Sequence, residues 1–353
     1  MADTLVWLAA LPLIGAVATL LLPRQGNAIA NASAVATAVT AGILVHAVSG
    51  QGALRYAIGG WQAGLGIALR ADGLSALLLL MTALVMLAAT TYAGAYFSTA
   101  AQRRHFWPLW LLLWTSLNAL LLAGDLFNLY VTLELLGLSA VALACLGGKT
   151  AAIRAALRYL LVGLLGSMMF LAGVSLIYAG YGTLDMAMLS TAMAPGPVAW
   201  TALALMTAGL LLKSALFPLH FWLPPAHANA PAPVSAVLSA LVVKAAFYLL
   251  LRLWLDVFAV VITPAAASLL GTLGAGAVLW GSWQALQAER LKLLAAYSTV
   301  AQLGYLFMFF PLLQALPPGP TRDLAAGGLV ILALTHGLAT AGLFLAIGVI
   351  QQR

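Results

Sequence analysis

The sequence predicts an all-α polytopic membrane protein with about eleven transmembrane helices. Of the 353 residues, 64% are hydrophobic and 7% are charged, whereas ordinary soluble domains have about 45–50% apolar and about 25% charged residues. So few charged side chains cannot cover the surface of a water-soluble fold. The apolar runs are long enough to cross a bilayer as helices, and none alternates with the period of two that a transmembrane strand requires.

Eleven apolar runs follow one another along the chain. They fall at 4–23, 28–48, 72–97, 106–123, 125–146, 155–179, 198–218, 231–253, 259–284, 291–312 and 325–350. The first run differs from a signal peptide because Asp3 replaces a basic segment and no clear cleavage site precedes Arg24. We therefore expect a retained helix. The longest loops, 49–71 and 180–197, are too short for a soluble domain, and the piece 183–190 suits a segment lying flat at the membrane surface.

Basic residues at the ends of these runs predict the orientation. Nine occupy one set of ends: Arg24, Arg103, Arg104, Lys149, Arg154, Arg158, Arg290, Lys292 and Arg353. Four occupy the opposite ends: Arg55, Arg70, Arg252 and Arg322. The larger set is expected in the cytoplasm, which places the N-terminus outside and the C-terminus inside the cell inner (plasma) membrane. Because the net charge of +7 comes from such isolated residues, it indicates topology and not a nucleic-acid partner.

No cofactor or metal site is expected in this chain. Its single cysteine, Cys145, excludes disulfides, iron–sulfur ligation and multi-cysteine zinc sites. The sequence has no dinucleotide-binding fingerprint and no haem ligands. His220 and His227 are seven residues apart across a proline turn, which is a weak spacing for metal ligands. We therefore expect no catalytic chemistry of its own.

Most charged residues lie near the ends of the apolar runs, but three lie in their interior, where each costs a few kcal/mol. They are Glu134, Lys213 and Lys244. One interpretation is a structural ion pair between Glu134 and one lysine, but this leaves the second lysine unexplained, and apolar packing would stabilise a bundle equally well. The alternative is a proton relay, because the proton affinity of a desolvated lysine depends on how near a carboxylate lies.

A helix break is expected beside Lys213. Pro218 removes a helix hydrogen bond near the end of the run 198–218, and Pro224 follows it. Non-helical backbone at membrane depth is tolerated only where it is buried in protein or lines a cavity. Lys213 is predicted one turn before this break.

Three histidines are further candidates for a proton pathway. His220 and His227 flank the break, and His336 lies within the last run. A single histidine is more often a packing residue than a relay. Two of them beside a broken helix and a buried lysine favour the relay, whereas packing and a hydrogen-bonded chain are equally compatible with His336.

Four segments carry a resemblance to a known family. They are GDLFNLYVTLE at 124–134, LKSALFPLHFWLPPAH at 212–227, PAPVSAVLSALVVK at 231–244 and ERLKLLAAYSTVAQLGY at 289–305. These segments resemble the antiporter-like proton-translocating membrane subunits shared by Mrp-type cation/proton antiporters, respiratory complex I and membrane-bound hydrogenases. The first segment is most similar to the Mrp D-type subunit.

The resemblance implies a fold of inverted five-helix repeats, each with a broken helix. Residues 1–105 would form an N-terminal three-helix segment, 106–253 a complete first repeat and 259–353 an incomplete second repeat. It also implies that Glu134 and Lys213 form the coupling pair and that Lys244 passes protons towards His336.

Two departures from the family are expected to matter. Thr340 stands where the family usually has a lysine, and a threonine cannot carry a proton charge. The chain also stops at Arg353, inside the implied second repeat. A half-channel reaching the central axis is therefore supported, and either a partner completes the exit or independent pumping is lost.

The leading hypothesis is a proton-translocating subunit of a hetero-oligomeric membrane complex, with Mrp-type monovalent cation/proton antiport as its activity. The alternative is a proton-pumping subunit of a redox-driven NADH:quinone oxidoreductase or hydrogenase, or of a proton-coupled inorganic-carbon uptake complex. A third hypothesis is a degenerate scaffold subunit, which Thr340 favours and the retained charges Glu134, Lys213 and Lys244 oppose.

Overall fold

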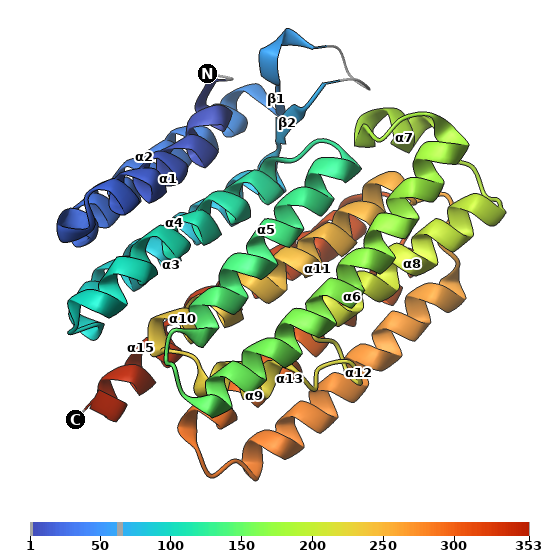
Figure 1. Ribbon diagram of the computed structural model, residues 1–353. Helices are drawn as coiled ribbons and strands as arrows, with labels where there is room; N and C mark the ends of the chain where they lie inside the picture. The colour runs from blue at the N-terminus through green and yellow to red at the C-terminus, as the bar shows by residue number, and fades with distance from the viewer. Residues whose placement is uncertain (1–2, 62–65, 353) are drawn as a thin grey trace.

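Long apolar helices account for most of the computed structural model, which describes residues 3–61 and 66–352 (Figure 1). They are α1 Asp3–Leu21, α2 Gly26–Gln51, α3 Gly73–Tyr96, α4 Ala100–Leu122, α5 Leu126–Cys145, α6 Thr150–Tyr181, α8 Pro197–Lys213, α12 Pro264–Leu286, α13 Leu291–Phe307 and α15 Pro320–Gln352. The shorter helices are α7 Met186–Ala192, α9 Leu223–Asn229, α10 Ala232–Val237, α11 Val243–Arg252 and α14 Phe309–Ala315. In the described part of the chain, 10 helical segments are long and apolar enough to span a membrane, and α8 is a shorter apolar helix. The prediction of a polytopic all-α membrane protein is confirmed.

One helical segment runs through the middle of the bundle. Residues 232–257 combine α10 and α11 with two π-helical segments, Leu238–Val242 and Leu253–Val257. This composite helix packs against α3, α4, α5, α8 and α15 and is buried almost throughout. Apart from Lys244, Arg252 and Asp256 its side chains are almost all apolar, and such a helix is stable only in these surroundings or in lipid.

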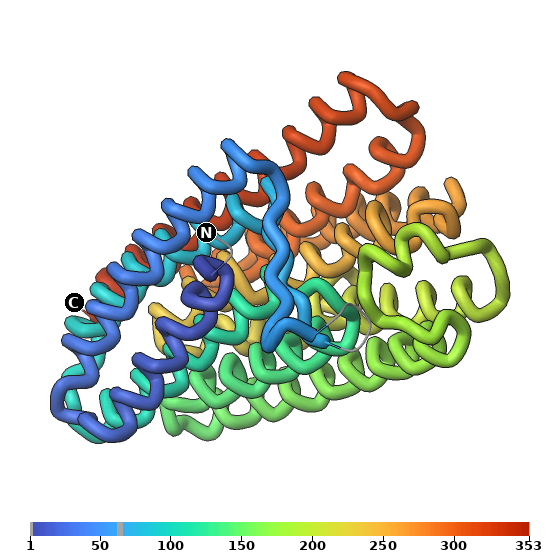
Figure 2. Tube along the Cα trace, turned by 90° about the horizontal axis from the view of Figure 1, so that it is seen from above, coloured from blue at the N-terminus to red at the C-terminus, as the bar shows by residue number. Residues whose placement is uncertain are grey.

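The helices at the two ends of the sequence meet at one side of the bundle. α1 and α2 pack on each other and on α3 and α4, and the C-terminal half of α15 lies beside α3 (Figure 2). Two glycines permit this approach, because a side chain on Gly337 would collide with Met81 and one on Gly348 with Tyr92.

The loop after α2 contains a β-hairpin that the sequence analysis did not predict. Strands β1 Leu54–Ala57 and β2 Ala68–Ala71 pair antiparallel, with Leu54 opposite Ala71. The hairpin is held by partners distant in sequence, since Leu69 forms a bridge with Ala123 and Arg55 an ion pair with Asp185. No local alternation signals such a short strand pair, so the sequence alone did not indicate it.

α7 begins close to the start of the piece expected to lie flat at the membrane surface. The Asp185 side chain accepts hydrogen bonds from the backbone N–H groups of Ala187 and Met188, which caps the first turn. The helix then runs to Ala192, two residues beyond the predicted piece 183–190.

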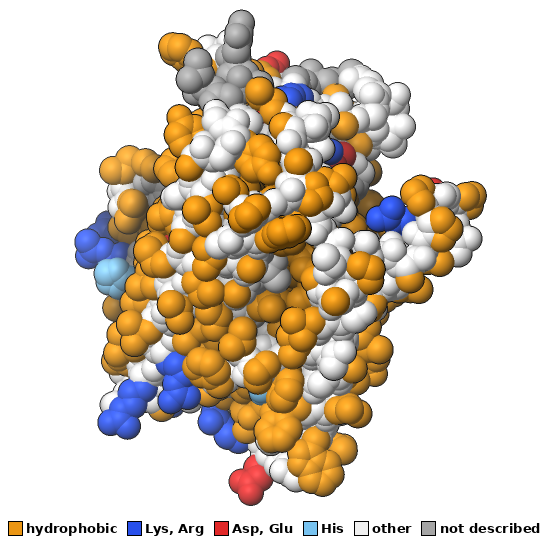
Figure 3. Space-filling view, turned by 90° about the vertical axis from the view of Figure 1, so that its right-hand side faces the viewer, with side chains coloured by type: hydrophobic (Ala, Val, Ile, Leu, Met, Phe, Trp, Pro, Cys, Tyr) orange, Lys and Arg blue, Asp and Glu red, His pale blue; other side chains and the backbone are white. Residues whose placement is uncertain are grey.

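Charges divide between the two ends of the bundle. Successive long helices run in opposite directions, so one end carries the hairpin, α7 and the helix termini at Asp3, Asp72, Asp125, Asp185, Asp256 and Asp323. We call this end the hairpin face. The opposite face carries eight of the nine basic residues of the larger set, and Arg353 lies outside the described residues. Between the charged margins the surface is broadly hydrophobic (Figure 3).

Candidate functional site

The structure joins the intramembrane glutamate to one of the two intramembrane lysines. Glu134 comes from the middle of α5 and Lys213 is the last residue of α8. The Lys213 Nζ donates a hydrogen bond to the Glu134 Oε1 at 3.1 Å, and their side chains are 9% and 19% exposed. In a medium with little water, each charge compensates the desolvation of the other.

The backbone after Lys213 explains why α8 ends there. The N–H groups of Ala215 and Leu216 bond the carbonyls of Leu212 and Leu211, and Ala215 adopts a left-handed conformation with φ 53°. This is a Schellman ending. The helix therefore stops at Lys213, five residues before Pro218, and not at residue 218 as predicted.

Trp222 secures this ending from the far side of the break. Its Nε1 donates to the Leu212 carbonyl at 2.9 Å, and its ring stacks on Tyr159 of α6 with centroids 4.3 Å apart. Pro224 lies in the first turn of α9, which is where proline is tolerated in a helix. The break thus spans residues 214–222 and is tied to the neighbouring helix.

A cavity of about 30 Å³ lies against the Glu134–Lys213 pair. It has room for about two water molecules. Gly137, one turn after Glu134, lines it, and a Cβ there would lie 3.7 Å from the Lys213 Nζ, in ordinary van der Waals contact. Val242 and Ala246 of the central helix line the same cavity.

Lys244 is held differently from Lys213. Its Nζ donates to the Ser239 carbonyl at 3.1 Å, one of the carbonyls of the π-helical segment 238–242. The Ser239 hydroxyl lies 2.7 Å from the Thr299 hydroxyl of α13. Within residues 3–61 and 66–352, Lys244 forms no ion pair, although it is only 3% exposed.

The three candidate histidines are buried but not linked in a chain. His220 stacks on Phe217 within the break, and His227 of α9 stacks on Phe344 of α15. His336 lies beside a 340 Å³ groove of α13 and α15. In the described ranges, no direct hydrogen bond joins these rings to Lys213 or Lys244, and neither ring nitrogen of His336 has a partner.

Three hydrogen bonds near the site were not expected from the sequence. Lys292, taken only as a topology signal, is buried and donates to the Ala230 carbonyl, while Arg290 donates to the Ala228 carbonyl at 2.9 Å. Both follow α12 and cap the end of α9. The Thr340 hydroxyl donates to the His336 carbonyl. The sequence feature that could have indicated a role for Lys292 was its position within segment 289–305, one of the four segments that resemble the family.

Comparisons with known proteins agree with the resemblance. Residues 123–353 match the family described as NADH:quinone oxidoreductase/Mrp antiporter, TM. The chain is 37% identical over 351 residues to NADH-quinone oxidoreductase subunit N of Desulforudis audaxviator, covering 96% of this chain and 68% of the relative. It is 37% identical over 330 residues to the D-type subunit of a probable K(+)/H(+) antiporter of Rhizobium meliloti, covering 87% and 60%.

The fold agrees as well. A chain in the structure of the Mrp complex from Dietzia sp. superposes with a TM-score of 0.89 and 27% identity, over 100% of this chain and 65% of that one. The chain thus spans between 60% and 68% of the length of the two curated relatives. The predicted resemblance is confirmed, and the chain belongs to the NADH:quinone oxidoreductase/Mrp antiporter transmembrane family.

Proposed function

We propose that this chain is a proton-translocating subunit of a multi-subunit membrane complex that carries out Mrp-type monovalent cation/proton antiport. The observation that carries the proposal is the Glu134–Lys213 pair, placed in mid-membrane beside a cavity with room for water. The similarity to D-type antiporter subunits from two bacteria supports the choice of antiport.

The geometry supports a two-station transfer. A lysine in low dielectric holds its proton more tightly when a carboxylate is near, so separating Lys213 from Glu134 favours release of a proton into the adjacent cavity. The central helix lines that cavity and carries Lys244. Lys244 rests on a carbonyl without a counter-ion in the described residues, so it is the next site whose charge responds to a movement of the pair. His227 and His336 lie within electrostatic range of it.

A redox-driven complex is the second candidate. The specific observation in its favour is the 37% identity to an NADH-quinone oxidoreductase subunit N across 96% of this chain. The energy for proton pumping would then come from redox reactions in companion proteins. Native mass spectrometry of the complex extracted from its own membranes separates the two candidates, because flavin, iron–sulfur or nickel proteins accompany only the redox-driven form.

We propose a plasma-membrane location with the hairpin face outside. The basic residues of the opposite face support this orientation, since cytoplasmic loops are enriched in Lys and Arg. We also propose the division into an N-terminal segment 1–105, a first repeat 106–253 with the broken helix α8–α9, and a second repeat 259–353.

Charge removal tests the proposal directly. Glu134→Gln and Lys213→Met are introduced into the native complex, which is reconstituted in liposomes containing a pH-sensitive dye. We expect coupled proton movement to be lost while all subunits still copurify. Glu289→Gln removes the other glutamate of the sequence, which is exposed, and should leave transport unchanged. Normal transport in both site variants would contradict the proposal.

A further inference from the structure

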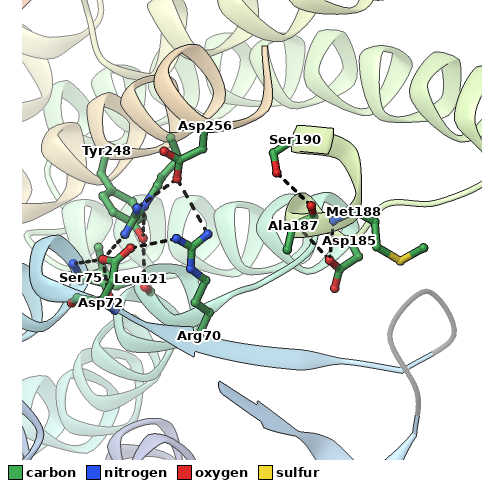
Figure 4. A network of polar contacts seen from close by, with 11 residues as sticks. Arg70, Asp72, Ser75, Leu121, Asp185, Ala187, Met188, Ser190, Tyr248 and Asp256 are labelled. Carbon is green, nitrogen blue, oxygen red and sulfur yellow. Dashed lines mark hydrogen bonds and ion pairs between the residues drawn. The ribbon is translucent and has the colours of Figure 1, made fainter. Parts of the chain in front are cut away.

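A second group of charges closes the central helix at the hairpin face. Arg252, the last residue of α11, contacts Asp72 and donates to the Asp256 Oδ2 at 3.1 Å. Arg70 of β2 lies 3.2 Å from Asp72 and 3.9 Å from Asp256. We call these four residues the hairpin-face cluster (Figure 4). Two arginines and two aspartates balance in charge, and the side chain of Arg252 is only 10% exposed.

The cluster is firmly tied to three helices. Asp72 caps α3 by accepting from the Ser75 N–H at 3.1 Å. Arg252 donates from Nε to the Tyr248 hydroxyl at 3.1 Å, and that hydroxyl donates to the Leu121 carbonyl of α4 at 3.1 Å. Burial disfavours the charged form of Asp72, but the hydrogen bond and charge of Arg252 outweigh it, so the pKa of Asp72 lies below its usual value.

A small cavity separates the cluster from Lys244. Lys244, Tyr248 and Arg252 occupy every fourth position of α11 and therefore share one side of the helix. A 20 Å³ cavity along this side is lined by Lys244, Tyr248 and Leu251, with Leu74 and Leu78 of α3 opposite. It has room for about one water molecule. Tyr248 lines this cavity and its hydroxyl accepts the hydrogen bond from Arg252, so the cluster adjoins the cavity on its hairpin-face side.

We propose that the hairpin-face cluster is the outer end of a proton route that leaves Lys244 along α11, with Asp72 as its terminal proton acceptor and Arg252 as the group that closes it. This inference rests on the proposed proton-translocating function. While Arg252 contacts Asp72, the carboxylate stays ionised and the cavity is shut. When Arg252 moves away, water joins the cavity to the hairpin face, and a proton from Lys244 reaches Asp72.

Cysteine accessibility tests whether the cluster closes the cavity. The background is the whole complex carrying Cys145→Ala, and the reporter is Leu78→Cys, treated with a membrane-impermeant thiol reagent from the hairpin face. We expect Asp72→Asn to accelerate labelling about tenfold. Without the Asp72 carboxylate, Arg252 loses one of the two charges that hold it in place, and the cavity opens more often. Asparagine still caps a helix, so the start of α3 is retained. Unchanged labelling would overturn the proposal.

Matched controls separate opening of the route from general loosening. Asp125→Asn alters another capping aspartate at the same face, which bonds Asn128 and contacts no arginine in the described residues, and should leave Leu78→Cys protected. A second reporter, Leu303→Cys, is fully buried away from the cavity and should stay protected throughout. If Asp72→Asn exposes both reporters, the same labelling is repeated with Arg252→Lys. Labelling of Leu78→Cys alone then supports the proposal. Labelling of both reporters, or of neither, overturns it.

Proton leak tests whether the route serves protons. Liposomes with the Arg252→Gln complex, which loses the closing charge but keeps Asp72, should show a passive leak raised several-fold, and adding Asp72→Asn or Lys244→Met should return it to the parent level. A leak that persists without Lys244 overturns the route. Labelling and leak do not require coupled transport, so they stand or fall separately from the effect of Glu134→Gln on antiport.

Discussion

The Nζ of Lys213 lies 3.1 Å from the Oε1 of Glu134, although 79 residues separate them in the sequence. Glu134 lies in the middle of α5, and Lys213 is the last residue of α8. Two glycines bring α6 and α8 close enough, since a Cβ on Gly166 or Gly209 would collide with a carbonyl of the other helix. The pair is therefore a product of helix packing and not of a local motif.

Removing one member of this pair should cost more stability than removing both. Lys213→Met leaves an uncompensated carboxylate, and we expect a loss of about 3 kcal/mol, at the lower end for buried pairs because Glu134 is partly exposed. The double variant Glu134→Gln with Lys213→Met should recover most of this loss while transport stays absent. Apparent melting midpoints of the purified parent, single-variant and double-variant complexes measure these differences in stability. Recovery of transport in the double variant would contradict a role of the charges in proton movement.

Ala215→Gly should stabilise the protein. Ala215 is a non-glycine residue at φ 53°, a left-handed conformation that costs alanine about 1 kcal/mol and glycine almost nothing. We expect a higher melting midpoint for this variant. Ala202→Gly, within α8, should instead lower stability by about 1 kcal/mol. Equal effects of the two substitutions would show that the strain at Ala215 is negligible.

Asp72 and Asp125 should affect acid stability with opposite signs. The pKa of Asp72 is depressed in the folded protein, because Arg252 outweighs the effect of burial. The stabilisation of the folded state by ionised Asp72 is therefore present at neutral pH and is lost as pH falls below about 4. Burial raises the pKa of Asp125, and its hydrogen bonds with Asn128 offset this only in part. The stabilisation of the folded state by protonated Asp125 is present at low pH and is lost as pH rises through the raised pKa.

Melting midpoints between pH 3 and pH 7 measure these two contributions. Asp72→Asn should reduce the loss of stability on acidification. Asp125→Asn should increase stability at neutral pH relative to the parent, because a buried charge is removed. Parallel shifts in both variants would rule out the assigned causes.

Lys292→Met should destabilise the broken helix. The Lys292 ammonium donates to the Ala230 carbonyl, and removing it leaves that acceptor with only a long 3.5 Å contact from the Ser235 hydroxyl, at a cost of about 1 kcal/mol. Lys149→Met removes an exposed lysine of the same face and should change stability by less than about 0.5 kcal/mol. Hydrogen exchange of residues 223–230 locates the effect, and unchanged protection there would argue against the cap.

The sequence by itself determined that the chain is a bundle of apolar, membrane-spanning helices and where most of them lie, because apolar length and the cost of burying charge act residue by residue. For the same reason it isolated Glu134, Lys213 and Lys244 as costly charges that need an explanation. The four motif segments also predicted the family that the comparisons confirmed. The functional roles of these residues stay proposals.

Only the tertiary structure decided which charges meet. The contact of Glu134 with Lys213 is the pairing that the resemblance implied, but no sequence feature indicated that Arg252 contacts Asp72, 180 residues away, or that Arg55 holds the hairpin through Asp185. Helix α8 ends at Lys213 and not at residue 218, because Trp222 and the left-handed Ala215 satisfy its last carbonyls. Such contacts depend on which helices pack side by side, and local apolar composition does not predict which helices become neighbours.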